Sequence, residues 1–276
     1  MNRIRVESDG ALARITLARP EKRNALDHET THELLQAFTS CAQHTGTRAV
    51  LLTADGADFC AGADLTALAG MLDATAEEHY ADAEALGRVF IAMREMPKPV
   101  IAVVRGRALA GGAGLATAAD IVIAHEDAQF GYPEILVGFV PAMVMTMLRR
   151  SVGEKRAYDL VASGRRVGAA EALEMGLVSR VMGGDDFTDK ATAIAREISE
   201  SSASAQALTK TLFYQLDGLD FRDGVLAGAR TNVAARSTED FRNGVLRFTK
   251  RARGASTRSR SGWRAGRWYC LHGRSD

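Results

Sequence analysis

The chain has 276 residues, of which 46% are hydrophobic, and its formal net charge at pH 7 is only +1. This length is enough for one large domain with a sizeable core, or for such a domain with a small appendage. No run of about 18 apolar residues occurs, so we expect no membrane span, and the first residues lack the apolar block of a signal peptide. The three cysteines are widely spaced, which argues against a disulfide framework or a thiolate zinc site and favours a cytoplasmic location.

Strands and helices are predicted to alternate over the first half of the chain. Asp27 is a suitable N-cap for a helix whose apolar stripe includes Leu34 and Phe38. A second helical stretch is expected over 67–96, and helical periodicity dominates from 154 to 250. This order indicates an α/β fold with a helical C-terminal third. The predicted strands cover 11–19, 48–55, 99–104, 119–125 and a short stretch within 128–140, and a helix is predicted over 141–150.

Two turns that contain glycine follow predicted strands. In "FCAGADL", Gly62 frees the backbone, and the N–H of Ala63 points outward if Asp64 starts a helix as its N-cap. In "AGGAG", the N–H of Gly111 lies at the start of a small-residue helix, where unpaired N–H groups meet the positive end of the helix dipole. Each turn alone is most simply a site of close packing. Together they would bind one oxygen whose negative charge grows in a transition state, such as a thioester enolate.

Glu134 is the candidate acid or base. It follows Pro133 within the apolar stretch "GYPEILVGFV", where partial desolvation would raise a carboxyl pKa toward neutrality. The alternative is a glutamate on a surface loop. The signatures GxSxG, HExxH and GxxxxGK[ST] do not occur. His28 and His32 are four residues apart on a predicted helix without an evident third ligand, so we predict no metal site.

The chain resembles the crotonase superfamily, the enoyl-CoA hydratase/isomerase family, from about residue 11 to residue 250. The resemblance implies a spiral of ββα turns and a C-terminal helical region used in trimerisation, with trimers often pairing into hexamers. We therefore expect a crotonase-like spiral core over 1–195, a C-terminal helical region over 196–250, and a homotrimer or hexamer. Six segments carry the resemblance in the family's order and spacing: "ARPEKRNAL", "FCAGADL", "PVIAVVRGRALAGGAGLATAADIVIA", "AQFGYPEILVGFVPA", "GEKRAYDLVASGRRVGAAEALEMGLVSRV" and "STEDFRNGVLRF".

The resemblance also implies roles for single residues. The oxyanion-hole N–H groups of the family fall on Ala63 and Gly111, and the catalytic glutamate falls on Glu134. Coenzyme A enters as part of an acyl-CoA substrate, and neither a separate cofactor nor a metal is implied. The substrate contacts fall on Lys22, Arg23 and Asn24 for the adenine and phosphates, on Ala61, Asp64 and Leu65 near the pantetheine and thioester, and on Phe248 with Lys250 or Arg251 from a neighbouring subunit.

Hydratases of the family typically carry a further catalytic glutamate three residues after the oxyanion-hole glycine, where this chain has Gly114. One glutamate is enough to move a proton between carbons beside a thioester, which is the chemistry of a Δ3-Δ2 enoyl-CoA isomerase. The segments "GGAGL" and "PEILVGFVPAMV" instead resemble a single-glutamate branch that includes methylglutaconyl-CoA-type hydratases. We favour a hydratase on this resemblance and keep the isomerase as the alternative.

The segment 251–276 differs in kind from the rest of the chain. It contains seven arginines and both tryptophans and has no helix or strand period, so we expect a disordered tail. A basic segment with aromatic residues favours nucleic-acid binding, which we keep only as a distant alternative. A second hypothesis is a frameshift, because the family resemblance stops at "RFTKR".

Overall fold

The computed structural model describes residues 3–259, and side chains up to residue 249. A six-stranded sheet has the order β1-β2-β3-β4-β6-β9, in which only the β1–β2 pair is antiparallel. A second sheet has the order β5-β7-β8. The large sheet consists of β1 (Ile4–Asp9), β2 (Leu12–Leu17), β3 (Ala49–Ala54), β4 (Val100–Val104), β6 (Ile121–His125) and β9 (Arg180–Met182), and the small sheet of β5 (Arg107–Leu109), β7 (Gln129–Gly131) and β8 (Arg166–Gly168).

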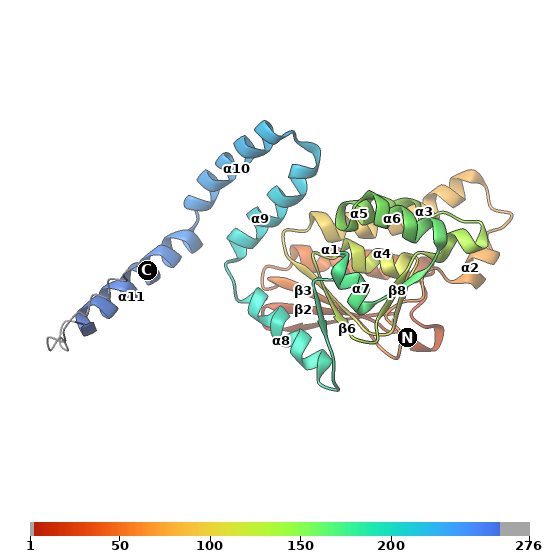
Figure 1. The fold of residues 1–276 in the computed structure, drawn as a ribbon, viewed down its shortest axis with the longest axis horizontal. Coiled ribbons are helices and arrows are strands. Elements are labelled where there is room, and N and C mark those ends of the chain that lie inside the picture. Colours follow the sequence, from red (N-terminus) through yellow and green to blue (C-terminus); the bar gives the residue numbers. More distant parts are fainter. Residues whose placement is uncertain (1–2, 260–276) are drawn as a thin grey trace, which may run out of the picture.

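Helices cover both faces of the large sheet (Figure 1). On β3, Val50 and Leu52 pack into the larger apolar cluster, whereas Ala49 and Leu51 face the smaller cluster under α8 (Phe187–Ser199). A strand buried on both faces has a continuous apolar sequence, as predicted for this segment. The other helices of this part are η1 (Pro20–Lys22), α1 (His28–Gln43), α2 (Leu65–Ala69), α3 (Ala76–Glu95), α4 (Gly111–Ala118), η2 (Pro133–Val137), α5 (Ala142–Val152), α6 (Glu154–Ser163) and α7 (Ala169–Glu174).

One part of the predicted secondary structure is wrong, and another is incomplete. The expected helix over 67–96 is divided into α2 and α3, because Thr75 begins a new helix through a capping box with Glu78. The segment from 154 onward, predicted to be mostly helical, also contains the three-residue strands β8 and β9. Strands this short show no periodicity of their own, and their pairing partners are distant in the sequence.

The chain leaves the sheet after α8 and forms a helical arm of α9 (Ala203–Gln215), η3 (Leu216–Gly218), α10 (Phe221–Arg236) and α11 (Glu239–Ser259). The arm extends to one side of the sheet and its covering helices (Figure 1). The division of the chain at 195 and 250 stays a prediction, and α11 continues past the second of these positions. None of the helices in residues 3–259 combines the length and hydropathy that a bilayer span requires.

A buried polar cluster joins the arm to the rest of the protein. Lys210, the only buried residue of α9, donates to an oxygen of Asp120 at 2.7 Å and to the carbonyl oxygen of Met93 at 2.7 Å. The hydroxyl of Tyr214 donates to the other oxygen of Asp120 at 2.6 Å. The guanidinium of Arg94 lies 4.4 Å from the Tyr214 ring centre and donates to the last carbonyl groups of α4. Asp120 therefore has a structural role.

Candidate functional site

The loop that carries Ala63 is held by backbone hydrogen bonds on both sides. Cys60 pairs with β5, since its N–H donates to that strand and its carbonyl accepts from it, each at 2.9 Å. On the other side, the Leu26 N–H donates to the Gly62 carbonyl at 2.8 Å, and the Asp64 N–H donates to the Leu26 carbonyl at 2.8 Å. Backbone bonds on both sides fix the direction of each remaining N–H in this loop.

The N–H groups of Ala63 and Gly111 stay outside these ladders. Leu26 bonds to the residues on either side of Ala63, so the Ala63 N–H faces away from it. Gly111 is the first residue of α4, a position without an intrahelical acceptor. Neither N–H donates to any acceptor in the described part of the chain. A Cβ on Gly62 would lie 3.5 Å from the Gly111 nitrogen, so the two loops are in contact.

Two glycines make this contact sterically possible. Gly62 has a φ of +94°, and a Cβ there would lie 2.7 Å from the Cβ of Ala110 and 2.8 Å from the Leu109 carbonyl oxygen. A Cβ on Gly112 would overlap the carbonyl oxygen of Cys60 and lie 2.6 Å from its Cβ. The absence of a Cβ at Gly62 and at Gly112 therefore lets the loop of Ala63 pack directly against the start of α4.

The residue before Gly111 is strained, and nothing in the sequence indicated it. Ala110 has φ 50° and ψ −123°, a sparsely populated region for a residue with a Cβ. Its N–H donates to the Gly131 carbonyl at 2.9 Å, which anchors the start of α4 to β7. Through this turn, the Gly111 N–H points away from the N-terminal end of α4. An alanine in the sequence gives no indication of such a backbone conformation.

Glu134 lies three residues beyond this anchor, in the 3-10 helix η2. One carboxylate oxygen, Oε2, is buried and has no hydrogen-bond partner among the described residues. Burial raises the pKa of Glu134, and a hydrogen bond from its own backbone N–H partly opposes that rise. A buried polar atom left without a partner is rare in folded proteins and is a common mark of a functional group. The Oε2 atom of Glu134 is therefore buried within the protein and does not lie on a surface loop.

The wall beside Gly114 is apolar and filled. A Cβ on Gly114 would lie 2.7 Å from Cζ of Phe90 and 2.9 Å from Cγ2 of Val144. Both side chains are buried, at 5% and 3% exposure, and come from α3 and α5. The chain therefore has neither a second carboxylate at this position nor the space for one.

The three residues expected at the adenine and phosphates differ in environment. Lys22 and Arg23 are exposed at the end of η1, and Arg23 has a left-handed backbone. Asn24 is buried, and its amide donates to the carbonyl oxygens of Asp55 and Asp58 at 2.9 Å each. Both amide hydrogens of Asn24 are thus used within the protein, and this side chain fixes the loop on which the two exposed cations lie.

Asp64 caps α2, as the sequence predicted. Its side chain accepts from the backbone N–H groups of Thr66 at 3.0 Å and Ala67 at 3.4 Å. Leu65 follows with 70% exposure, and Ala61 is half-buried. Phe248 lies on α11 with 77% exposure. Lys250 belongs to the same helix, but its side chain is outside the described residues.

The thiol nearest to these loops is not available for chemistry. Cys60 is fully buried, and burial raises the pKa of its thiol to about 12. Cys60 therefore serves as a small buried residue. Within the described part of the chain, no three side chains of His, Cys, Asp or Glu are grouped so as to hold a metal ion.

Comparisons with known proteins identify the family of this chain. A family model described as enoyl-CoA hydratase/isomerase matches residues 7–255. A Thermus thermophilus protein with a provisional enoyl-CoA hydratase name is 41% identical over 239 residues, which cover 87% of this chain and 94% of that one. An enoyl-CoA hydratase structure from Bacillus anthracis has a TM-score of 0.85 at 31% identity, covering 90% of this chain and 96% of that one.

A human relative has the same fold. The structure of human enoyl Coenzyme A hydratase domain-containing protein 3 has a TM-score of 0.86 at 26% identity and covers 90% of this chain and 98% of that one. The resemblance found in the sequence and the crotonase-like fold expected from it are both confirmed. This chain belongs to the enoyl-CoA hydratase/isomerase family and is an enzyme of that family.

Proposed function

We propose that this enzyme binds an acyl-CoA thioester with its carbonyl oxygen between the N–H groups of Ala63 and Gly111. Glu134 would be the only acid–base group. The observation that carries the proposal is the Glu134 carboxylate, which has a buried oxygen without a partner and a pKa raised by burial. Two free N–H groups at adjoining loops are suited to stabilise the enolate oxygen as charge moves onto it.

The favoured reaction is hydration of a 2-enoyl-CoA by one glutamate. Glu134 takes a proton from water as the oxygen of that water bonds to C3. The electron pair of the C2–C3 double bond moves toward C2 and the thioester oxygen. Glu134 then returns the proton to C2, so that water is added across the double bond and the carboxylate is regenerated. A single-glutamate hydratase of the methylglutaconyl-CoA type would follow this scheme.

The alternative is Δ3-Δ2 isomerisation, and the wall at Gly114 favours it. Glu134 would remove a proton from C2 of a 3-enoyl-CoA and return it to C4 after the double bond has moved. This reaction needs no water beside the acyl chain, and Phe90 and Val144 leave little room for one at the position of the missing carboxylate. The same wall fits an apolar acyl chain in either reaction.

Substrate contacts and assembly form the second part of the proposal. The exposed cations Lys22 and Arg23 are suited to phosphate groups of coenzyme A, which is bound as part of the substrate without another cofactor. The arm exposes several large apolar side chains, which in a stable protein are usually covered by a partner. We propose that a second copy covers them in a homotrimer or a dimer of trimers. The exposed residues are Phe213, Leu216, Phe221, Val225, Leu226, Val233, Phe241, Val245, Leu246 and Phe248.

Product analysis tests the reaction. The enzyme is incubated with 2-enoyl-CoA, 3-enoyl-CoA and 3-methylglutaconyl-CoA, and the products are identified by mass spectrometry and NMR. Glu134→Gln should lower kcat by about 10²–10⁴-fold while coenzyme A still binds. The matched control is Glu174→Gln, which changes an exposed glutamate paired with Arg156. Turnover near the wild-type value in Glu134→Gln would refute Glu134 as the acid–base group.

Sedimentation tests the assembly. Val233→Asp places a charge on the arm at a residue with 66% exposure, where the isolated chain would tolerate it. We expect the variant to sediment as a monomer and the wild type as a trimer or hexamer. A wild-type protein that sediments as a monomer at all concentrations would contradict the proposed assembly.

A further inference from the structure

Leu26 contacts both of the loops that carry the free N–H groups. Its backbone bonds to Gly62 and Asp64, the neighbours of Ala63 on either side, at 2.8 Å each. Its side chain packs on the start of α4, because a Cβ on Gly111 would lie 3.2 Å from Cδ1 of Leu26. The position of Leu26 therefore sets the direction of the Ala63 N–H and the spacing of the two loops.

The turn that leads to Leu26 has a strained backbone. Arg23 and Asn24 have φ values of 53° and 54°, which places two successive residues with a Cβ in the left-handed region. Such a backbone persists only where the surrounding structure holds it. The carbonyl oxygen of Arg19 accepts from the Asn24 N–H, and the Arg19 N–H donates to the Asn24 side-chain oxygen, at 2.8 Å each. The backbone of Arg19 therefore closes this turn.

The side chain of Arg19 holds the residues on either side of Leu26. Its terminal nitrogen Nη1 donates to the Ala25 carbonyl oxygen at 3.0 Å. The same nitrogen donates to Oδ2 of Asp27 at 2.7 Å. One guanidinium thus fixes the chain directly before and directly after Leu26.

The same guanidinium reaches the loop of Ala63. Its other terminal nitrogen, Nη2, donates to Oδ2 of Asp64 at 3.4 Å. Asp27 caps α1 and Asp64 caps α2, in each case through Oδ1, so the second oxygen of each cap accepts from Arg19. The side chain of Arg19 is 13% exposed, and those of the two carboxylates are 16% and 12% exposed. Opposite charges that are shielded from water in this way interact more strongly than charges on the surface.

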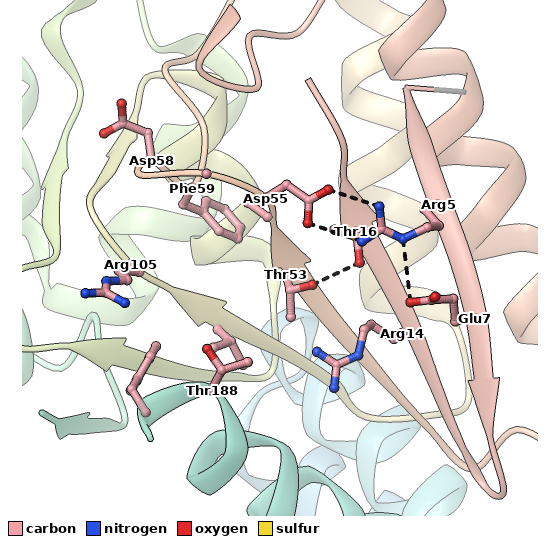
Figure 2. Close-up of a pocket in the computed structure, with 14 residues that line it drawn as sticks. Arg5, Glu7, Arg14, Thr16, Thr53, Asp55, Asp58, Phe59, Arg105 and Thr188 are labelled. Carbon is pink, nitrogen blue, oxygen red and sulfur yellow. Dashed lines mark hydrogen bonds and ion pairs between the residues drawn. The ribbon is translucent and has the colours of Figure 1, made fainter. Parts of the chain in front are cut away.

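Other cations hold the beginning of the loop that carries Ala63. The Asp55 carboxylate accepts two hydrogen bonds from Arg5 on β1, at 3.0 and 3.2 Å (Figure 2). Asp58 accepts from the side chain of Arg107, at 2.6 and 2.7 Å. Loss of the Arg19 side chain would therefore loosen the end of the loop, where Ala63 lies, and leave its beginning in place.

We propose that Arg19 is a positioning residue, which fixes the direction of the Ala63 N–H by holding Leu26 and Asp64 in place. It acts through the backbone of Leu26 and the cap of α2. The inference rests on the proposed function, in which the N–H groups of Ala63 and Gly111 donate to the thioester oxygen.

Infrared difference spectroscopy of a bound thioester tests this role. Butyryl-CoA labelled with ¹³C at its carbonyl is saturated, so it can be neither hydrated nor isomerised, and its carbonyl stretch reports the hydrogen bonds to the oxygen. Binding to the wild type should lower the stretching frequency. The lowering should be smaller in Arg19→Met, and kcat for the reactive substrate should fall roughly tenfold or more, because small displacements of a positioned group have large kinetic effects.

Arg3→Met is the matched control. Arg3 also pairs with Asp27, but it has no bond to Asp64 in the part of the chain that the structure describes. This variant should keep the wild-type frequency and kcat even where it lowers the free energy of unfolding.

Asp64→Asn is the second variant, should Arg19→Met fail to fold. Asparagine caps a helix about as well as aspartate does, so this change weakens the link to Arg19 and keeps the cap of α2. It should reduce the frequency shift in the same direction as Arg19→Met.

Three outcomes decide the inference. An equal shift in the wild type, Arg19→Met and Asp64→Asn would overturn the positioning role and leave the proposed function standing. An equal reduction in Arg3→Met would also overturn it, because the effect would then follow from stability alone. Absence of any shift in the wild type would refute the donor role of Ala63 and Gly111, and this inference with it.

Discussion

The large sheet and its covering helices bury apolar side chains on both faces, whereas the three arm helices bury almost none. Up to residue 249 the arm buries only Lys210 and Ala227. Its polar links to the rest of the protein include the bonds of Lys210 to Asp120, Met93 and Lys98, the bond of Tyr214 to Asp120, and the ion pair of Asp217 with Arg150. Burial of apolar side chains therefore drives the folding of the core. The arm depends instead on the buried ion pair between Lys210 and Asp120 and, under the proposed assembly, on a partner that covers its exposed apolar side chains.

Under the proposed function, chemistry and assembly belong to separate parts of the molecule. The free N–H groups and Glu134 all belong to the core, and the exposed apolar side chains belong mainly to the arm. Substitutions at the candidate site should change turnover without releasing the arm. Substitutions at the polar cluster around Asp120 should release the arm without changing the groups of the candidate site. The four predictions below test this separation in order of decreasing effect.

The largest effect is expected for Lys210→Met. The substitution keeps most of the side-chain volume but leaves the partly buried Asp120 carboxylate without its cation, which should cost about 3–5 kcal/mol in the free energy of unfolding. Limited proteolysis should then cut first within the arm. Lys190→Met is the control, because it breaks an exposed pair worth only about 0.3–0.5 kcal/mol. Equal destabilisation in the two variants would show that the cluster does not hold the arm.

Gly112→Ala should lower turnover without releasing the arm. The new Cβ would overlap the Cys60 carbonyl oxygen and push apart the loops that carry the Ala63 and Gly111 N–H groups. Loss of one such donor is worth about 10²–10³ in kcat. Sedimentation and proteolysis of the arm should match the wild type. Gly168→Ala is the control, since a Cβ there meets no atom within 4 Å, and a similar loss of kcat in that variant would contradict the geometric argument.

Gly114→Ala should overfill the apolar wall. Its Cβ would lie 2.7 Å from Phe90, and overpacking of this kind costs about 1–3 kcal/mol in the free energy of unfolding. The double variant Gly114→Ala/Phe90→Leu should recover part of that loss by freeing space, as measured by denaturant unfolding. A double variant that is no more stable than the sum of the single changes would rule out their contact as the cause.

The smallest effect is a pH dependence of stability at Glu134. Burial raises the pKa of this carboxyl in the folded chain above its ordinary value of 4.5, so the folded state holds the proton more tightly than the unfolded state. Its stabilising contribution is full below pH 4.5 and is lost as the pH rises through the folded-state pKa. Compared with Glu134→Gln, the wild type should therefore lose stability over that range, and a pH-independent difference would contradict the raised pKa.

The sequence predicts the elements that have a local cause. The N-caps Asp27 and Asp64 and the apolar run of β3 are all present, because each depends on side chains next to the backbone it shapes. Strands of three residues, such as β8, depend on distant partners and leave no local pattern. The bond between Lys210 and Asp120 joins residues 90 positions apart, and only the tertiary fold brings them together.

The candidate site likewise has some parts that the sequence marks and others that only the tertiary fold reveals. Glycines 62, 111 and 112 mark their turns in the sequence, since a backbone with positive φ or close contacts requires glycine there. The strained Ala110 and the two amide bonds of Asn24 have no such mark. The apolar neighbours of Gly114 are Phe90 and Val144, which lie 24 positions before it and 30 positions after it in the sequence. The sequence therefore showed that the glutamate is missing, but not that these two side chains occupy its place.

The backbone origin of the two free N–H groups has a consequence for how such an enzyme diversifies. The side chains of Phe90 and Val144 line the wall but supply no part of the Ala63 or Gly111 donors. Under the proposed function, exchange of those two side chains would reshape the acyl pocket over generations and leave the two backbone donors intact. If that proposal holds, the choice of acyl group and the stabilisation of the enolate charge can evolve separately.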